Sequence, residues 1–206
     1  MVLGALACEL FDVDQMHERY RLAIQANPGN ISALSNYSVS LSRIGLLREA
    51  VNVLHKLVER EPTNLAHLRN LVKEQFHGFM LSDAMESLKV LQKRDPNHDA
   101  GRHANIHKAA ALLDSLGHAK DYGERQMGIA CALLREKKLR CREFSLFVND
   151  EFDDSTVFVQ LRLFVGIEAA IGLSEELFGR LDQAIEDWNP AHLSISFEAG
   201  APDYER

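Results

Sequence analysis

Three prolines recur at a constant interval in the first half of the chain. Pro28, Pro62 and Pro96 follow one another at intervals of 34 residues, and each comes directly after a polar residue. Proline ends a preceding helix, because it lacks the backbone N–H and its ring clashes with the turn before it. The spacing therefore predicts a repeated helical unit of 34 residues, which constrains the fold more than any other feature of the sequence.

Apolar positions repeat with the same interval and divide each unit into two segments. Within each segment they fall three or four residues apart, which predicts amphipathic helices. The first helices are expected over residues 31–44 and 65–78, and the second over residues 47–60 and 81–94. Gly45 and the Gly78-Phe79 step mark the turns between them. The repeated positions are Leu34, Tyr37, Ala50, Leu54 and Leu57, followed one interval later by Leu68, Leu71, Ala84, Leu88 and Leu91.

These residues resemble the tetratricopeptide repeat (TPR), a helix–turn–helix unit of the same length. Ala50 and Pro62 stand where the family has alanine and proline, and Leu3-Gly4 matches its Leu-Gly pair. The resemblance covers residues 1–97 and continues in degenerate form to about residue 140. It implies an α-solenoid of antiparallel helix pairs, in which the small alanine lets the two helices of a pair approach closely.

The two ends of this repeat region are irregular. Met1 falls inside the expected first helix of the first unit, so that helix is predicted over residues 2–12 only, and exposed apolar residues such as Phe11 are expected to invite a partner or a second copy. After Pro96 two further helices are predicted, over residues 99–116 and 120–138, as a degenerate fourth unit or a closing pair.

The periodicity changes after Arg142. Alternating and β-branched runs predict strands over residues 143–148, 156–165 and 192–197, with a helix over residues 166–188 between the last two. A right-handed crossover sets the last strand parallel to the second. The predicted fold class is therefore mainly α, with a TPR-type solenoid over residues 1–140 and a small α+β (β-β-α-β) domain over residues 141–206.

Charge and cysteine content bound the function. The formal net charge is −7, which disfavours nucleic acid and anionic membranes as partners. Residues 1–140 carry 19 Lys and Arg against 16 Asp and Glu, whereas residues 141–206 carry 4 against 14. Three cysteines without CxxC spacing favour a reducing compartment, and no apolar run is long enough to span a bilayer. The cytoplasm is therefore the expected location.

The TPR resemblance also implies a binding surface. In that family the first helices of successive units line a concave groove that holds a peptide. Basic and amide side chains predominate in the corresponding positions, so an acidic segment or a C-terminal carboxylate is the expected ligand. Two alternatives are a solvated charged face and a surface that packs on the chain's own acidic C-terminal part. The candidate partner-binding residues are Asn36, Arg43, Arg69, Asn70, Lys73, His77, His103 and His107.

Other candidate sites have weaker support in the sequence. His103 and His107 share a helix face in a spacing that suits a metal, but no further ligands lie beside them. The acidic run Asp150, Glu151, Asp153 and Asp154 lacks the EF-hand spacing for Ca²⁺, so a solvated turn is expected there. Arg140 and Arg142 flank Cys141, and their charge is expected to lower the pKa of its thiol. We expect no metal and no cofactor.

The sequence therefore favours a protein–protein interaction module, an adaptor or assembly factor, rather than an enzyme. It contains no GxSxG, P-loop or GxGxxG motif. Two other functions stay open at this point. One is an enzyme or a ligand or metal sensor, with a pocket between the helical repeats and the C-terminal α+β unit. The other is a self-associating structural subunit, such as a homodimer.

Overall fold

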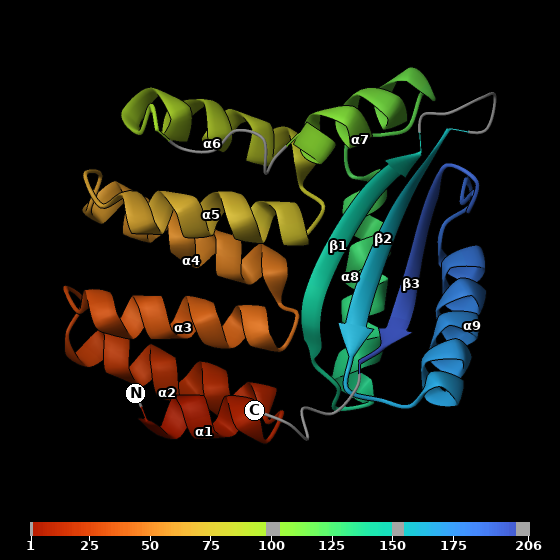
Figure 1. Ribbon diagram of the computed structural model, residues 1–206. Helices are drawn as coiled ribbons and strands as arrows, with labels where there is room; N and C mark the ends of the chain where they lie inside the picture. Colours follow the sequence, from red (N-terminus) through yellow and green to blue (C-terminus); the bar gives the residue numbers. More distant parts are fainter. Residues whose placement is uncertain (1, 98–103, 150–154, 201–206) are drawn as a thin grey trace. The chain divides into compact units, whose positions relative to one another are not determined.

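The computed structural model describes residues 2–97, 104–149 and 155–200 of the chain. It is mainly helical and ends in a small sheet (Figure 1). In chain order the elements are α1 (Val2–Glu9), α2 (Val13–Ala26), α3 (Ile31–Arg43), α4 (Leu47–Arg60), α5 (Leu65–His77), α6 (Leu81–Arg94), α7 (Ala104–Ser115), α8 (Tyr122–Glu136), β1 (Cys141–Asn149), β2 (Thr156–Leu163), α9 (Ile167–Ala184) and β3 (Leu193–Ala199).

By internal packing the chain forms two compact units. Unit 1 comprises residues 1–78 and 83–99, and unit 2 comprises residues 79–82 and 100–206. The helices α7 and α8 therefore accompany the sheet. The predicted division into separate domains at residue 140 stays a prediction.

The predicted helix pairs are present, and consecutive helices pack against each other. The turn inside each of the first three pairs contains a residue in the left-handed region, with φ of 56° at Phe11, 72° at Gly45 and 58° at Phe79. These residues follow the 34-residue interval of the prolines. Such a residue ends an α-helix and lets the chain reverse. The repeated backbone conformation confirms a helical-repeat architecture.

Polar contacts repeat with the same interval. The side chains of Asn30 and Asn64 cap α3 and α5, accepting from the backbone N–H of Ala33 at 3.0 Å and of Ala66 at 3.1 Å. At the other end of the pairs, Arg60 donates to the carbonyl of Pro28, and Arg94 donates to the carbonyl of Pro62 at 2.7 Å. Each arginine thus ties its helix to the preceding proline turn. The interval seen in the sequence is therefore an interval of contacts as well.

Small residues permit the close approach of paired helices, as predicted. Ala50 and Ala84 are fully buried. A Cβ atom at Gly4 would lie only 2.8 Å from Cε2 of Tyr20, so the Leu3-Gly4 step admits the Tyr20 ring against α1. The predicted apolar positions Leu34, Leu41, Leu54, Leu57, Leu68, Leu71, Leu88 and Leu91 are all buried.

Two helix boundaries differ from the prediction. The helix expected over residues 2–12 ends at Glu9, because Phe11 takes the left-handed conformation that reverses the chain. Phe11 is half-buried rather than exposed. The helix expected up to residue 188 ends at Ala184, because the buried Ile185 is extended, with φ −127° and ψ 105°. The predicted start of a helix at residue 99 lies outside the described residues.

Unit 2 contains a three-stranded sheet in the order β1-β2-β3. The strands β1 and β2 are antiparallel, and β2 and β3 are parallel, as the right-handed crossover predicted. Val159 and Ile195 are fully buried, whereas Phe147 and Phe158 are exposed, so one face of the sheet forms the core. The helices α8 and α9 both pack against β3 (Figure 1).

Each outer strand has a backbone group bonded to a helix side chain. Asn105 of α7 donates from Nδ2 to the carbonyl of Leu146 in β1 at 2.8 Å. The backbone N–H of Phe197 in β3 donates to Oγ of Ser174 in α9 at 3.0 Å. Both contacts use backbone groups that an added strand would require. They make sheet extension at either edge less favourable.

Candidate functional site

The strongest candidate for a binding surface is the side of α3 and α5 predicted to line a groove. Asn36 and Asn70 are exposed and occupy equivalent positions on the two helices, as do Arg43 and His77. Ser42 Oγ donates to Glu74 Oε2 at 2.5 Å and joins α3 directly to α5. The structure therefore brings the predicted residues of these two helices onto adjacent helices of one compact unit.

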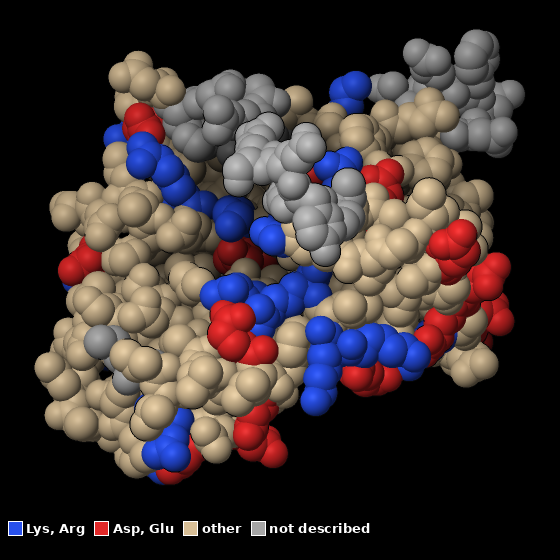
Figure 2. Space-filling model, turned by 60° about the horizontal axis from the view of Figure 1, so that its bottom comes forward, with Lys and Arg blue, Asp and Glu red and all other residues tan. Residues whose placement is uncertain are grey.

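The cations of this surface already have carboxylate partners in the chain. Arg43 lies 2.7 Å from Glu9, and Arg69 lies 2.6 Å from Asp95. The face shown in Figure 2 likewise places most basic side chains beside acidic ones. The predicted net basic groove is thus balanced by carboxylates. An acidic ligand has to compete with these internal partners, which lowers the gain from each surface ion pair.

Glu74 is the buried polar centre of this surface, and sequence reasoning missed it. It lies 3.5 Å from Nζ of Lys73 and 3.8 Å from Nδ1 of His77, and its side chain is only 8% exposed. Burial alone would raise its pKa. The contacts with His77 and Ser42 and the charge of Lys73 outweigh that effect, so the pKa of Glu74 is lowered. Glu74 therefore stays ionised and links the two helices.

A signal for Glu74 was present in the repeat. It is the one acidic residue of α5, and it lies one interval after Ser40, which is also buried. The register thus marks this position as a contact between helix pairs, where a carboxylate needs partners.

The two candidate histidines beyond α5 are not brought to this surface by the described structure. His103 lies outside the described residues, and His107 is exposed on α7 in unit 2. Within residues 2–97, 104–149 and 155–200, no group of three or more His, Cys, Asp or Glu side chains is placed to hold a metal. The acidic run from Asp150 to Asp154 also falls outside these ranges.

The expectation of a reactive Cys141 is wrong. Although the residue as a whole is exposed, desolvation of its thiol and the nearby charge of Glu143 raise its pKa to about 11. Its Sγ donates to the backbone carbonyl of Glu143 at 3.1 Å. The pKa of the Cys131 thiol is raised to about 12, chiefly by burial. Both thiols are therefore protonated at neutral pH and are poor nucleophiles.

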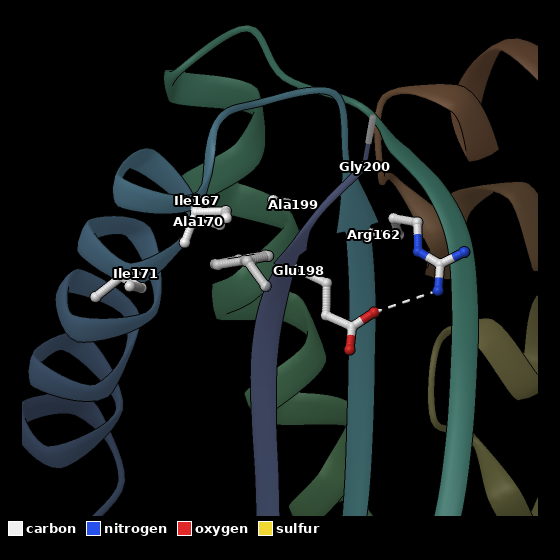
Figure 3. Close-up of a pocket in the computed structure, with 8 residues that line it drawn as sticks. Arg162, Ile167, Ala170, Ile171, Glu198, Ala199 and Gly200 are labelled. Carbon is white, nitrogen blue, oxygen red and sulfur yellow. Dashed lines mark hydrogen bonds and ion pairs between the residues drawn. The ribbon is translucent and has the colours of Figure 1, made fainter. Parts of the chain in front are cut away.

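Each unit also carries an open hollow that the sequence did not reveal. In unit 1 a hollow of about 430 Å³ lies along α2 beside Tyr37, whose hydroxyl is 2.7 Å from Nδ1 of His17. In unit 2 a hollow of about 470 Å³ lies between α9 and β3. Figure 3 shows Ile167 and Ile171 on one side of it, with Glu198 linked to Arg162 at 3.4 Å on the other.

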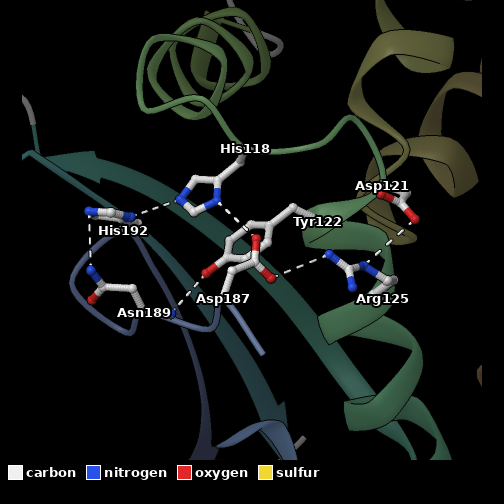
Figure 4. A network of polar contacts seen from close by, with 7 residues as sticks. All are labelled: His118, Asp121, Tyr122, Arg125, Asp187, Asn189 and His192. Atoms are coloured by element: carbon white, nitrogen blue, oxygen red, sulfur yellow. Dashed lines mark hydrogen bonds and ion pairs between the residues drawn. The ribbon is translucent and has the colours of Figure 1, made fainter. Parts of the chain in front are cut away.

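A second polar cluster lies inside unit 2 (Figure 4). His118 Nε2 lies 2.8 Å from His192 Nδ1, and His192 Nε2 lies 3.2 Å from the side-chain nitrogen of Asn189. The Asn189 oxygen accepts from the N–H of Ala191 at 2.9 Å, which fixes its amide orientation. Asn189 therefore donates to His192, and His192 donates to His118. This order requires both imidazoles to be neutral.

The surroundings of His118 favour its neutral form. Its ring stacks on Tyr122 with centroids 3.8 Å apart, and its Nδ1 lies 3.9 Å from Asp187, which also lies 3.6 Å from Arg125. Burial and the proximity of His192 lower the pKa of His118, and the opposing charge of Asp187 does not overcome them.

Unit 2 is therefore expected to lose stability as the pH falls below 6.5, the ordinary pKa of His118. In that range the unfolded chain binds the proton and the folded chain resists it, so the free energy of unfolding decreases until the folded pKa is reached. Urea unfolding between pH 7.5 and 5.5, followed by the fluorescence of Trp188, measures this slope. His118→Phe should flatten it, whereas His107→Gln should not. An unchanged slope in His118→Phe would exclude this assignment.

No protein-family model matches the chain, and a comparison with curated proteins finds no match either. In the part of the chain that the structure describes, the helices all fall short of the length or apolar character needed to cross a bilayer. The fold and the geometry of the surface on α3 and α5 therefore carry the functional argument.

Proposed function

We propose that the chain is a protein-binding module of the TPR type, an adaptor or assembly factor that holds a peptide against α3 and α5. The observation that carries the proposal is the repeated presentation of Asn36 and Asn70 on the exposed side of two adjacent, equivalent helices. A side-chain amide both donates and accepts, which suits it to pair with an extended peptide backbone.

The charged residues beside the asparagines set the ligand class. The side chains of Arg69 and Lys73 are 49% and 59% exposed, so each can bond a ligand while keeping its internal carboxylate partner. A peptide with an acidic side chain or a terminal carboxylate is the proposed ligand. Because Asp95 and Glu74 already balance these cations, the backbone contacts of the asparagines contribute more to affinity than charge does.

Neutralising the two cations tests the surface without reversing its charge. Charge reversal would set a new carboxylate against Asp95 and Glu74, so Arg69→Gln with Lys73→Gln is the cleaner change. Peptides selected from a random library on the wild-type protein should bind this variant at least tenfold more weakly, a loss of about 1.4 kcal/mol.

The matched control removes the same charge from a different helix. Lys89 and Lys93 are exposed on α6, and Lys89→Gln with Lys93→Gln should leave the affinity unchanged. Equal affinity of both variants and the wild type would remove the surface on α3 and α5 from consideration.

A further inference from the structure

The first helix leaves an apolar stripe exposed. Val2 is 82% exposed, Leu3 and Leu6 are each 54% exposed, and Leu10, just after the helix, is 64% exposed. Spacings of three and four residues place the leucines on one side of α1. Figure 2 turns the end of unit 1 that carries α1 toward the viewer and shows a large uncharged area there. Isolated exposed leucines are ordinary, but a continuous stripe marks an interaction surface.

The repeat register shows what this stripe corresponds to. One interval after Leu3, Leu6 and Leu10, the chain has the residues Tyr37, Ser40 and Ile44. Ser40 and Ile44 are buried, and Tyr37 is half-buried. The same three positions are thus covered in the second pair and exposed in the first.

The covering comes from the preceding helix pair. Tyr37 stacks on Tyr20 of α2 with ring centroids 5.0 Å apart. Ser40 Oγ lies 2.9 Å from the Tyr20 hydroxyl, and the Ser40 carbonyl accepts from Cys8 Sγ of α1 at 3.4 Å. These positions are therefore the contacts by which one pair packs on the pair before it. In α1 the same contact surface is apolar and faces solvent.

We propose that a second copy of this chain covers the stripe, with α1 packed antiparallel on α1 of the other copy. Leu3 and Leu10 lie at equal distances on either side of the midpoint between residues 6 and 7. A two-fold axis at that midpoint pairs Leu3 of each copy with Leu10 of the other and brings the two Leu6 side chains together. The stripe is thus complementary to itself, as an isologous interface requires.

Charge also favours a second copy as the occupant. Glu9 is the one charged residue of α1, and Arg43 of the same chain neutralises it at 2.7 Å. Two copies therefore meet without like-charge repulsion. Four aliphatic side chains are fewer than the 20–30 residues a side of a standard-size interface. We therefore expect a reversible dimer, half-formed at a concentration on the order of 10–100 μM. The proposal does not depend on peptide binding.

Sedimentation equilibrium of the full chain between about 1 and 300 μM measures the association directly. The wild type should pass from monomer to dimer with increasing concentration. Leu6→Glu should weaken association at least tenfold, because it places two carboxylates at the axis. Leu116→Glu, which changes a leucine of unit 2 that is 38% exposed, is the matched control and should dimerise as the wild type does.

A pair of double variants tests the antiparallel geometry. Leu3→Glu with Leu10→Lys sets opposite charges against each other across the axis, so it should associate at least tenfold more strongly than Leu3→Glu with Leu10→Glu. All the changed side chains are exposed, and far-UV circular dichroism checks that the helices persist. A monomeric wild type over the whole range, equal association of the two double variants, or an undiminished dimer of Leu6→Glu would each overturn the proposal.

Discussion

Replacing Tyr20 with alanine is expected to lower the free energy of unfolding of unit 1 by about 3–5 kcal/mol. Tyr20 is 1% exposed and fills the space opposite Gly4. Its ring stacks on Tyr37, and its hydroxyl bonds Ser40. The substitution leaves a cavity at the junction between the first two helix pairs. Because a helical repeat is held by contacts between neighbouring pairs, this loss is not compensated elsewhere.

Urea unfolding followed by far-UV circular dichroism measures the effect, and Tyr20→Phe separates its two parts. The phenylalanine keeps the ring and removes only the hydrogen bond to Ser40, so a loss of about 1 kcal/mol is expected. Trp188, the single tryptophan, reports on unit 2 in the same samples. A loss below 1 kcal/mol in Tyr20→Ala would contradict the placement of Tyr20 between the pairs.

Replacing Gly123 with alanine is expected to destabilise unit 2 by about 3 kcal/mol, at the upper end of overpacking substitutions. A Cβ atom at this position would lie 1.9 Å from Cδ1 of Phe79, so the ring or α8 has to move. Phe79 is 1% exposed and sits in the left-handed turn after α5, which leaves its ring little freedom. The midpoint of urea unfolding, monitored by Trp188 fluorescence, gives the magnitude.

Gly128 provides the control on the same helix. It is exposed, and a Cβ atom there meets no atom within 4 Å. Gly128→Ala should therefore stabilise unit 2 by about 0.5–1 kcal/mol, through helix propensity alone. Destabilisation by Gly128→Ala, or an unaffected Gly123→Ala, would contradict the packing of α8 against Phe79.

The repeat predicted the helical part of the fold well, because helix boundaries depend on local signals. The proline turns and the apolar positions three or four residues apart are such signals, and the helices over 47–60 and 81–94 have the predicted bounds. The end of α1 was misplaced, because the left-handed conformation of Phe11 is imposed by the reversal of the chain. Phenylalanine has no intrinsic preference for that conformation.

The candidate site was predicted only in part. Its exposed residues follow from the repeat register, since the exposed side of each first helix recurs every 34 residues. Its charge balance did not follow, because Arg69 meets Asp95 across 26 residues and Arg43 meets Glu9 across helices. The thiol of Cys141 shows the same limit. Flanking arginines suggested a lowered pKa, but desolvation by residues distant in the sequence raises it.

The network around His118 was invisible in the sequence for a related reason. His118 and His192 are 74 residues apart, and neither lies in a recognisable motif. Only the packing of the turn before α8 against the turn before β3 brings them together. Long-range polar contacts of this kind depend on the tertiary fold, whereas periodicity reports on local structure.

Amide chemical-shift mapping tests the central claim most directly. The proposed function predicts that a peptide selected from a random library, added to the isotope-labelled full chain, shifts the amide and side-chain resonances of α3 and α5. The largest changes should surround Asn36, Asn70 and Lys73. Changes confined to unit 2 or to α1, with α3 and α5 unaffected at saturation, would contradict the assignment of peptide binding to this surface.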